Sequence, residues 1–364
     1  MSCDQQYMLR ALALAKKARP ISPPNPSVGC VIVRDGQILG EGFTQKTGSD
    51  HAEIRAIKNA NSKGFDIKEA TVYVTLEPCS HYGRTPPCAL RLIKEQVARV
   101  VVACLDPNPL VAGRGIAMLK EAGVEVLTGV LQEKAWQMNA GFMTRMTENR
   151  PWVRAKVAMS LDAYTALPNG ESQWITGPQA REDGRRWRCE AGAVLTGIGT
   201  VEADNPSLTA RVNGKLQQRQ PLKVLVDSSL KVSPQNRFFD EGAVLVAYAR
   251  GEEAKVRALK DRGAELLALP GGDARVDLLK LLTELARREV NEVHLEAGST
   301  LTGAMLRQGL VDEILCYVAP KFLGAGRPAF ALPALDSLAQ CQEWETVEVG
   351  SVGNDIRMIL RKRK

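Results

Sequence analysis

Apolar and polar residues alternate along the first part of the chain in runs that predict strands separated by helices. Strands are recognised by a period of two and helices by a period near 3.6. The predicted elements are a helix at 4–18, a hairpin of strands 30–33 and 38–44, a helix after residue 50, a strand at 71–76, a helix from residue 88, strands at 100–105 and 124–127, and a helix at 131–146. Asp35 and Gly36 supply the hairpin turn. This order predicts a sheet with helices on both faces, an α/β sandwich.

The pattern restarts after a polar stretch at residues 147–151 and again alternates strands with helices. Strands are predicted at 152–159, 193–196, 223–226, 244–247, 292–296, 314–319, 346–349 and 356–361, and helices at 179–190, 252–262, 276–288 and 301–308. A chain of 364 residues is too long for one ordinary hydrophobic core. We therefore predict two α/β domains, residues 1–147 and 150–364.

A histidine and a glutamate stand together where the second predicted helix begins. Ser49 and Asp50 offer N-caps for an apolar-periodic segment at 54–60, which puts His51 and Glu53 in the first helical turn. Imidazole is a common zinc ligand, and Glu53 is well placed to carry protons beside a metal held by His51.

Two cysteines follow in a matching local context. Cys79 follows the strand at 71–76, which Glu77 and Pro78 terminate, and Cys88 follows a proline pair at the start of a helix. A thiol at a helix N-terminus is favoured as thiolate by the helix dipole, which lowers its pKa and prepares it for metal.

Together these residues predict a catalytic zinc site. His51, Cys79 and Cys88 give three protein ligands, which leaves a fourth position for water. His-x-Glu with Pro-Cys-x-x-Cys is typical of zinc deaminases, although here eight residues separate the two cysteines. The alternative is a closed structural site with a fourth ligand, for which Cys30 and Cys104 are the nearest candidates. Both lie in or beside apolar runs, where a free cysteine is usually a small buried hydrophobe.

Two glycine-containing segments in the second half, 196–200 and 297–301, adjoin predicted strands. Backbone amides at such strand-to-helix junctions can hold a phosphate or pyrophosphate group. The first segment lacks the third small residue of the dinucleotide-binding fingerprint, so it is not a Rossmann signature. A bare turn is the alternative for either segment.

Composition excludes several classes of protein. No apolar run is long enough for a membrane helix, and residues 1–5 lack the features of a signal peptide. Eight cysteines without a disulfide-like framework indicate a reducing compartment, so we expect a cytoplasmic protein. The formal charge of +7 is spread along the chain, and the one basic cluster, residues 361–364, reads as a solvated tail. We therefore expect no nucleic-acid partner.

Several strings of sequence are specific when taken together. They are PNPSVG at 24–29, HAE at 51–53, TLEPCSHYGRTPPC at 75–88, DPNP at 106–109, MSLD at 159–162, WIT at 174–176, residues 200–211, and EAG at 296–298. They resemble the bacterial bifunctional riboflavin-biosynthesis enzymes, in which a pyrimidine deaminase is fused to a reductase. The resemblance covers nearly the whole chain and includes the eight-residue spacing of the cysteines.

For the first half, this resemblance implies a cytidine-deaminase-like α/β/α sandwich. Its reaction would be the zinc-dependent hydrolytic removal of the 2-amino group of 2,5-diamino-6-(5-phosphoribosylamino)pyrimidin-4(3H)-one. Carried onto this sequence, the family's zinc ligands are His51, Cys79 and Cys88, and its proton shuttle is Glu53. Residues implied in substrate binding are Asn25, His81 and Arg84, the last standing where the family usually has lysine. For Asn25 a plain turn role between prolines remains the alternative.

For the second half, the resemblance implies a dihydrofolate-reductase-like α/β domain that uses NADPH to reduce the ribosyl group to ribityl. The matching cofactor positions are Ala158, Trp174, Thr200, Asp204, Ser228, Gly298, Ser299, Thr300, Leu301, Thr302, Gly303 and Ala304. The matching substrate positions are Ser172, Arg188, Leu208, Arg211 and Glu296. Arg188 and Arg211 are suited to clamp a phosphate, and Asp204 to relay a proton.

Two residues depart from the family pattern. Ala163 stands where glycine is usual after Ser-Leu-Asp, and Ala297 replaces the first glycine of a Gly-Gly-Pro segment. Alanine at either position would be strained if the backbone there needs a positive φ.

We expect a small phosphorylated pyrimidine as substrate and a homo-oligomer, either dimer or tetramer, as the assembly. Two other functions are compatible with a zinc site. A zinc deaminase acting on a nucleobase in RNA would favour a short Cys-x-x-Cys and a coherent basic surface, and this chain has neither. A non-enzymatic, zinc-stabilised binding module would need neither Glu53 nor a second α/β domain.

Overall fold

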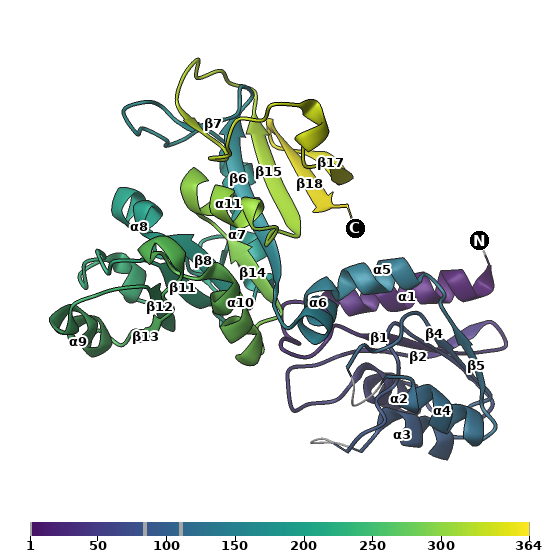
Figure 1. Cartoon of the computed structure of the whole chain (residues 1–364). Coiled ribbons are helices and arrows are strands. Elements are labelled where there is room, and N and C mark those ends of the chain that lie inside the picture. Colours follow the sequence, from purple (N-terminus) through teal and green to yellow (C-terminus); the bar gives the residue numbers. More distant parts are fainter. Residues whose placement is uncertain (1, 83–85, 109–111, 364) are drawn as a thin grey trace. The chain divides into compact units, whose positions relative to one another are not determined.

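The computed structural model describes residues 2–82, 86–108 and 112–363. The chain divides into two compact units, Met1–Asn149 and Arg150–Lys364, a division beside the predicted boundary. Each unit carries its own sheet, and the two are described separately (Figure 1). None of the described helices is both long and apolar enough to cross a membrane.

The first unit is built around a five-stranded sheet of order β2-β1-β3-β4-β5. Its elements are α1 (Cys3–Ala18), β1 (Gly29–Arg34), β2 (Gln37–Phe43), α2 (Ala52–Ser62), β3 (Thr71–Val74), α3 (Cys88–Lys94), β4 (Arg99–Val102), α4 (Arg114–Glu121), β5 (Glu125–Thr128), α5 (Gln132–Met138) and α6 (Ala140–Glu148). β1 runs antiparallel to β2 and β3, whereas β3, β4 and β5 are parallel. Helices α1 and α5 cover one face and α2, α3 and α4 the other, which confirms the predicted sandwich (Figure 1).

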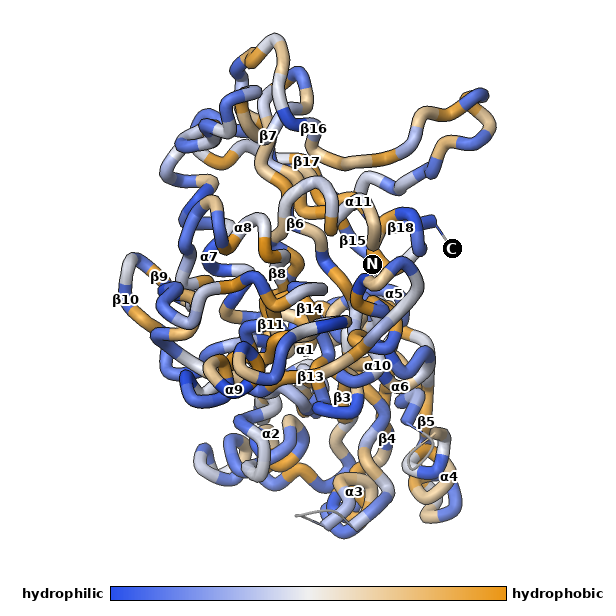
Figure 2. Tube along the Cα trace, turned by 60° about the vertical axis from the view of Figure 1, so that its left-hand side comes forward, coloured by the Kyte–Doolittle hydropathy of each residue, from blue (hydrophilic) through white to orange (hydrophobic). Residues whose placement is uncertain are grey.

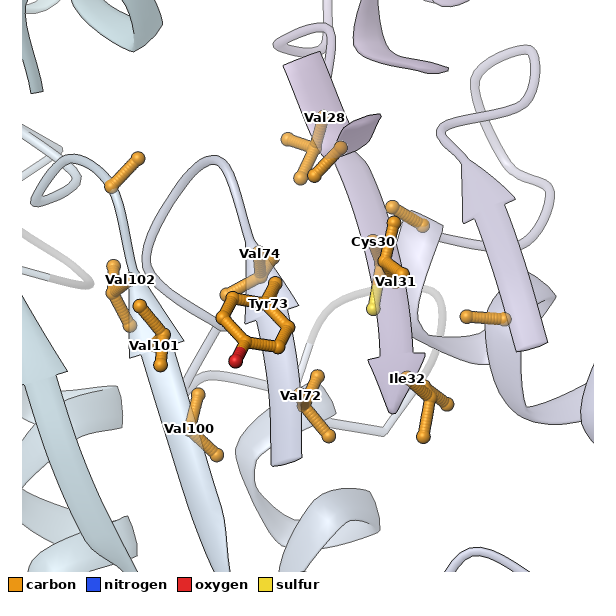
Figure 3. Close-up of a cluster of buried hydrophobic side chains, with 14 of the residues drawn as sticks. Val28, Cys30, Val31, Ile32, Val72, Tyr73, Val74, Val100, Val101 and Val102 are labelled. Carbon is orange, nitrogen blue, oxygen red and sulfur yellow. The ribbon is translucent and has the colours of Figure 1, made fainter. Parts of the chain in front are cut away.

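The centre of this sheet is buried on both faces because helices cover both. Successive valines 100 to 102 of β4 are all fully buried, as parallel strands under two helical layers require (Figure 3). Cys30 is fully buried in the same apolar cluster, and Cys104 is buried at its edge. Both therefore act as small hydrophobes, as predicted.

One predicted helix of this unit is broken. The apolar period at 131–146 predicts a single helix, but α5 ends and α6 begins around Asn139. The Asn139 amide is buried and pairs with the backbone of Ser27, accepting its N–H at 2.7 Å and donating to its carbonyl at 3.0 Å. Helix α4 was not predicted.

The second unit has a nine-stranded sheet of order β13-β12-β11-β8-β14-β6-β15-β18-β17. Its strands are β6 (Trp152–Ser160), β7 (Tyr164–Ala166), β8 (Ala193–Gly197), β9 (Arg211–Val212), β10 (Lys215–Leu216), β11 (Leu222–Val226), β12 (Val244–Tyr248), β13 (Glu265–Ala268), β14 (Glu292–Leu295), β15 (Glu313–Ala319), β16 (Arg327–Pro328), β17 (Trp344–Val352) and β18 (Asp355–Lys362). Its α-helices are α7 (Pro178–Glu190), α8 (Ile198–Asp204), α9 (Glu253–Asp261), α10 (Leu278–Arg287) and α11 (Ser299–Arg307). From β13 to β15 neighbouring strands are parallel. Beyond β15, β18 and β17 form an antiparallel hairpin at the edge of the sheet.

Alternation along the central strands fills two apolar layers in this unit. Val194 packs in the cluster with α8 and α9, whereas its neighbour Leu195 packs in the cluster with α10 and α11. The hydropathy colouring shows apolar residues concentrated along these strands (Figure 2). Helix α8, strand β13 and the short pairs β7–β16 and β9–β10 were not predicted.

The basic C-terminus is not the solvated tail that its composition predicts. Arg361 and Lys362 belong to β18, and the Arg361 guanidinium donates to buried Glu313 at 3.0 Å. Arg363 pairs with Glu343. Arg361 and Lys362 are therefore part of the sheet, whereas Arg363 lies exposed after it and Lys364 lies outside the described residues.

Candidate functional sites: a His/Cys/Cys centre and a strand-end cavity

Two connections of the first unit, the one before α2 and the one between β3 and α3, bring His51, Cys79 and Cys88 together. His51 is the N-cap of α2, one position before the first turn where it was predicted, and Glu53 lies within that turn. Cys79 follows β3, and Cys88 is the first residue of α3 with Pro87 as N-cap, as predicted. Gly42 of β2 permits this packing, because a Cβ there would lie 2.3 Å from the Ala52 carbonyl oxygen at the start of α2.

The geometry of these side chains fits a tetrahedral zinc ion. His51 Nδ1 lies 3.6 Å from Cys79 Sγ and 3.4 Å from Cys88 Sγ. Bond lengths of about 2.3 Å for Zn–S and 2.0–2.1 Å for Zn–N, at a tetrahedral angle, place nitrogen and sulfur about 3.6 Å apart. Among the described residues these three form the one His, Cys, Asp or Glu group close enough to hold a metal, so no fourth protein ligand closes the site.

Glu53 lies beside this centre and is 4% exposed. Burial, with the neighbouring Cys79 thiolate, raises the pKa of its carboxyl to about 7. A hydrogen bond from Cys88 holds the pKa of Cys79 near 4, while the same contact and burial raise that of Cys88. The low pKa expected for Cys88 from its helix position is therefore found at Cys79 instead.

The other site residues predicted in the first unit are Asn25, His81 and Arg84. Asn25 is half-buried, and its N–H donates to the Ser22 carbonyl at 2.9 Å. His81 is exposed and close enough to Asp106 to act on the pKa of that carboxyl, which burial raises to about 6. Arg84 lies outside the described residues.

A cavity of about 1700 Å³ opens at the carboxyl ends of the parallel strands in the second unit. Segments following β8, β11, β12 and β14 line it, together with the later part of β6. Ligands bind at this edge of parallel sheets, where loops from several strands converge. The volume exceeds the usual 300–1,000 Å³ of a small-molecule pocket, so it can hold a dinucleotide and a second ligand together.

Most of the predicted reductase residues line this cavity. They are Ala158, Ser172, Trp174, Arg188, Thr200, Asp204, Leu208, Ser228, Glu296, Gly298, Ser299, Thr300, Leu301 and Ala304. Thr302, Gly303 and Arg211 do not line it. Gly303 packs against the chain at Ala331, whose carbonyl oxygen would lie 2.4 Å from an added Cβ.

The two arginines expected to clamp a phosphate are both paired within the protein. Arg188 forms a buried two-pronged ion pair with Glu296, one arm of it at 2.9 Å, and this arginine holds the pKa of Glu296 well below its usual value against the effect of burial. Arg211 donates to Glu241 at 2.9 Å and to Thr209 at 3.1 Å.

Among the cationic residues of the cavity that were not singled out from the sequence are Lys156, Lys231, Arg250 and Arg275. Lys156 of β6 lines it, and burial lowers the pKa of its ammonium group. The signal available in the sequence was a lysine among the mostly apolar residues of this strand. Lys231, Arg250 and Arg275 line another part and are exposed, and their side chains form no hydrogen bond or ion pair with any described residue.

Backbone contacts at Ser228 join the segments that carry Lys231, Arg250 and Arg275. The Ser228 carbonyl accepts the N–H groups of Ala249 and Arg250 at 3.1 and 3.0 Å, and its hydroxyl accepts the N–H of Val276 at 3.2 Å. The loops after β11 and β12 are thereby joined to the segment before α10.

The two departures from the family pattern differ in structure. Ala163 has a φ of 64°, a left-handed conformation that strains alanine, whereas Ala297 is absent from the described non-glycine residues with positive φ. The expected strain therefore falls on Ala163.

Two family models divide the chain between them. The model described as the cytidine and deoxycytidylate deaminase zinc-binding region matches residues 1–104, and the RibD C-terminal domain model matches residues 151–358. With the zinc-type centre in one unit and the strand-end cavity in the other, the chain is a deaminase joined to a reductase, with zinc and NADPH as cofactors.

Full-length relatives give the same result. The riboflavin biosynthesis protein RibD of Escherichia coli is 44% identical, with 97% of this chain and 98% of that protein covered, and the Haemophilus influenzae protein is 43% identical, with 98% and 97% covered. A solved structure of Acinetobacter baumannii RibD has a TM-score of 0.89 at 41% identity, with 99% of each chain covered. The chain belongs to the RibD family and is a deaminase and reductase of riboflavin biosynthesis acting on a small pyrimidine substrate.

Proposed function

We propose that the first unit converts 2,5-diamino-6-(5-phosphoribosylamino)pyrimidin-4(3H)-one into 5-amino-6-(5-phosphoribosylamino)uracil, and that the second unit reduces the ribosyl group of that product to ribityl. A structure from Thermotoga maritima, 33% identical with a TM-score of 0.86 and 99% of each chain covered, is named as a diaminohydroxyphosphoribosylaminopyrimidine deaminase and 5-amino-6-(5-phosphoribosylamino)uracil reductase. The observation that carries the proposal is the His51, Cys79 and Cys88 cluster with buried Glu53 at its side.

In the deaminase reaction, His51, Cys79 and Cys88 would hold zinc, which would supply an activated water as the nucleophile. Glu53 accepts a proton from that water and delivers it to the departing amine nitrogen, because an amine leaves readily only when protonated. Burial raises the pKa of the Glu53 carboxyl above its usual value, which favours a group that both accepts and donates a proton. Asn25, His81 and Arg84 are proposed as substrate contacts.

In the reductase reaction, bound NADPH would supply the hydride for the ribose C1′, which can accept it once the sugar ring has opened to an imine. Positioning is the main demand, and the cavity supports it by gathering the proposed cofactor and substrate contacts on converging loops. Opening the ring requires a proton at its oxygen, and Lys156 and Asp204 are the candidate donors. The Arg188 ion pair fixes the orientation of Glu296, which we assign to substrate binding.

Selectivity for NADPH over NADH is assigned to Lys231, Arg250 and Arg275. The two cofactors differ by one phosphate on the adenosine ribose, and unpaired guanidinium groups are suited to bind a phosphate. The serine-linked junction around Ser228 holds these cations at the cavity edge.

We also infer a cytoplasmic location and a homo-oligomeric assembly, dimer or tetramer. All eight cysteines are free, as a reducing compartment requires. Strand β17 forms an edge of the large sheet and exposes Val347 and Val349, which is the kind of edge that a second copy covers.

The substitution Glu53→Gln tests the proposed reaction. Glutamine keeps the shape of the side chain but cannot carry the proton, so deaminase turnover should fall by about 10² to 10⁴ with zinc content unchanged. Given the already deaminated substrate, the same variant should oxidise NADPH at the parental rate. Ammonia release near the parental rate from the diaminopyrimidine would rule Glu53 out as the proton shuttle.

A further inference from the structure

A second buried glutamate lies two residues before the Cys79 ligand. Glu77 is 4% exposed, and its two oxygens accept four backbone N–H groups. One oxygen accepts from Gly115 at 3.0 Å and Ile116 at 3.3 Å, and the other accepts from Gly113 at 2.9 Å and Asp106 at 3.3 Å.

Three of those donors belong to the beginning of α4, where N–H groups have no partner within the helix. Gly113 is the N-cap of α4 and has no side chain to satisfy them. The Glu77 carboxylate therefore caps this helix from a distant part of the sequence, at the end where the helix dipole favours a negative charge.

The capped helix also packs directly on the backbone beside the ligand. A Cβ added at Gly115 would lie 2.0 Å from the Pro78 carbonyl oxygen, so α4 approaches Pro78 as closely as a glycine permits. The Glu77 N–H donates to the Cys104 carbonyl at 3.0 Å, which fixes the same segment to the end of β4.

Cys79 is held from its other side by α3. Its Sγ accepts the Cys88 N–H at 3.3 Å, and its carbonyl accepts the Ala89 N–H at 3.2 Å. The Cys79 thiol thus sits between two helix starts, one tied to it directly and the other through Glu77 and Pro78.

We propose that Glu77 is a positioning residue for zinc, which fixes Cys79 at its ligand distance by joining residues 77–79 to α4. The inference rests on the proposed zinc site. Groups that orient metal ligands typically contribute 10–100-fold to metal affinity, and an effect of this size is expected here. A cap that only stabilises the fold would leave the geometry and affinity of the metal site unchanged.

The test compares Glu77→Gln with Ser2→Ala in the full chain. Glutamine has the same size, but its NH₂ group is a donor and cannot accept a hydrogen bond from the backbone N–H groups. At least one of the N–H contacts is therefore lost. Ser2 caps α1 by accepting the Gln5 N–H at 3.2 Å, so its loss removes a helix cap of the same unit away from the metal.

Zinc affinity is measured by chelator competition, and ligand geometry by the absorption spectrum of the cobalt(II)-loaded protein. Glu77→Gln should bind zinc about 10–100-fold more weakly and shift the cobalt spectrum, whereas Ser2→Ala should change neither. If Glu77→Gln does not fold, Glu77→Asp, which draws the carboxylate back by one methylene, is measured in the same way.

Parental zinc affinity and an unchanged cobalt spectrum in a folded Glu77 variant would overturn the positioning role. Failure of the parental protein to bind zinc would instead refute the proposed site, so the two outcomes are distinguishable.

Discussion

Each residue of the zinc centre lies in a local context that marks it along the chain. His51 and Glu53 stand together at one helix start, and Cys88 directly follows prolines at another. Glu77 could not be found in this way, because the N–H groups that it accepts lie 29 to 39 residues further along the chain. Its function depends on how α4 packs, and α4 was not itself predicted.

At the residue scale, Ala163 carries strain that a glycine would relieve. The left-handed conformation costs a non-glycine residue about 1–2 kcal/mol, and glycine gives back about 0.5–1 kcal/mol through the entropy of the unfolded chain. Ala163→Gly should therefore raise the free energy of unfolding of the second unit by about 0.5–1 kcal/mol, seen as a melting temperature higher by roughly 1–4 °C.

The matched control is Ala297→Gly, the other position where the family usually has glycine. Ala297 does not have a positive φ, so glycine there should lower the melting temperature or leave it unchanged. Equal shifts in the two variants would show that strain at Ala163 is not the cause.

At the scale of elements, periodicity predicted the long helices and central strands well but missed those set by distant contacts. The break between α5 and α6 depends on Asn139 pairing with Ser27, 112 residues away in sequence. The seven-residue helix α8 is too short for its period to stand out. The cations at the cavity edge were also missed, because Lys231, Arg250 and Arg275 come from separate loops.

The position of Arg250 and Arg275 at the edge of the cavity predicts that they select NADPH over NADH. Arg250→Ala and Arg275→Ala should each raise the KM for NADPH by about tenfold, the equivalent of 1.4 kcal/mol, because a charge-assisted contact to the extra phosphate is lost. The KM for NADH, which lacks that phosphate, should change by less than about twofold. Steady-state NADPH and NADH oxidation with the deaminated substrate measures both.

Arg257→Ala is the control for that comparison. Arg257 lies exposed on α9 and does not line the cavity, so its removal lowers the charge of the unit equally without touching the cofactor. A parallel rise in KM for both cofactors in the Arg250 and Arg275 variants would contradict a phosphate-specific role.

At the scale of the whole molecule, each unit has a separate hydrophobic core. One apolar cluster draws its buried residues from positions 8 to 143, and the remaining clusters draw theirs from positions 153 to 359. The sequence allowed this division to be predicted because both halves carry a full alternation of strands and helices. Which residues belong to which half at the junction depends on tertiary contacts.

The contacts of Arg150 determine at which residue the two fragments should be divided. Its guanidinium donates to both oxygens of Asp312 at 2.7 Å, and Asp312 also accepts the Val153 N–H at 2.8 Å. Arg150 is therefore a structural part of the second unit, whereas Asn149 ends α6 in a left-handed conformation.

We predict that residues 1–149 and 150–364, made separately, both fold and keep their own chemistry, because each core is complete without the other. The first fragment should bind zinc and release ammonia from the diaminopyrimidine, and the second should oxidise NADPH with the deaminated substrate. Circular dichroism should show a cooperative melt for each. A fragment of residues 152–364 loses the Arg150 contacts, worth about 1.5–3 kcal/mol, and should melt roughly 3–12 °C lower than 150–364. Equal melting of these two fragments would place Arg150 outside the second unit, and a second unit that folds only in the full chain would show that its core is not independent.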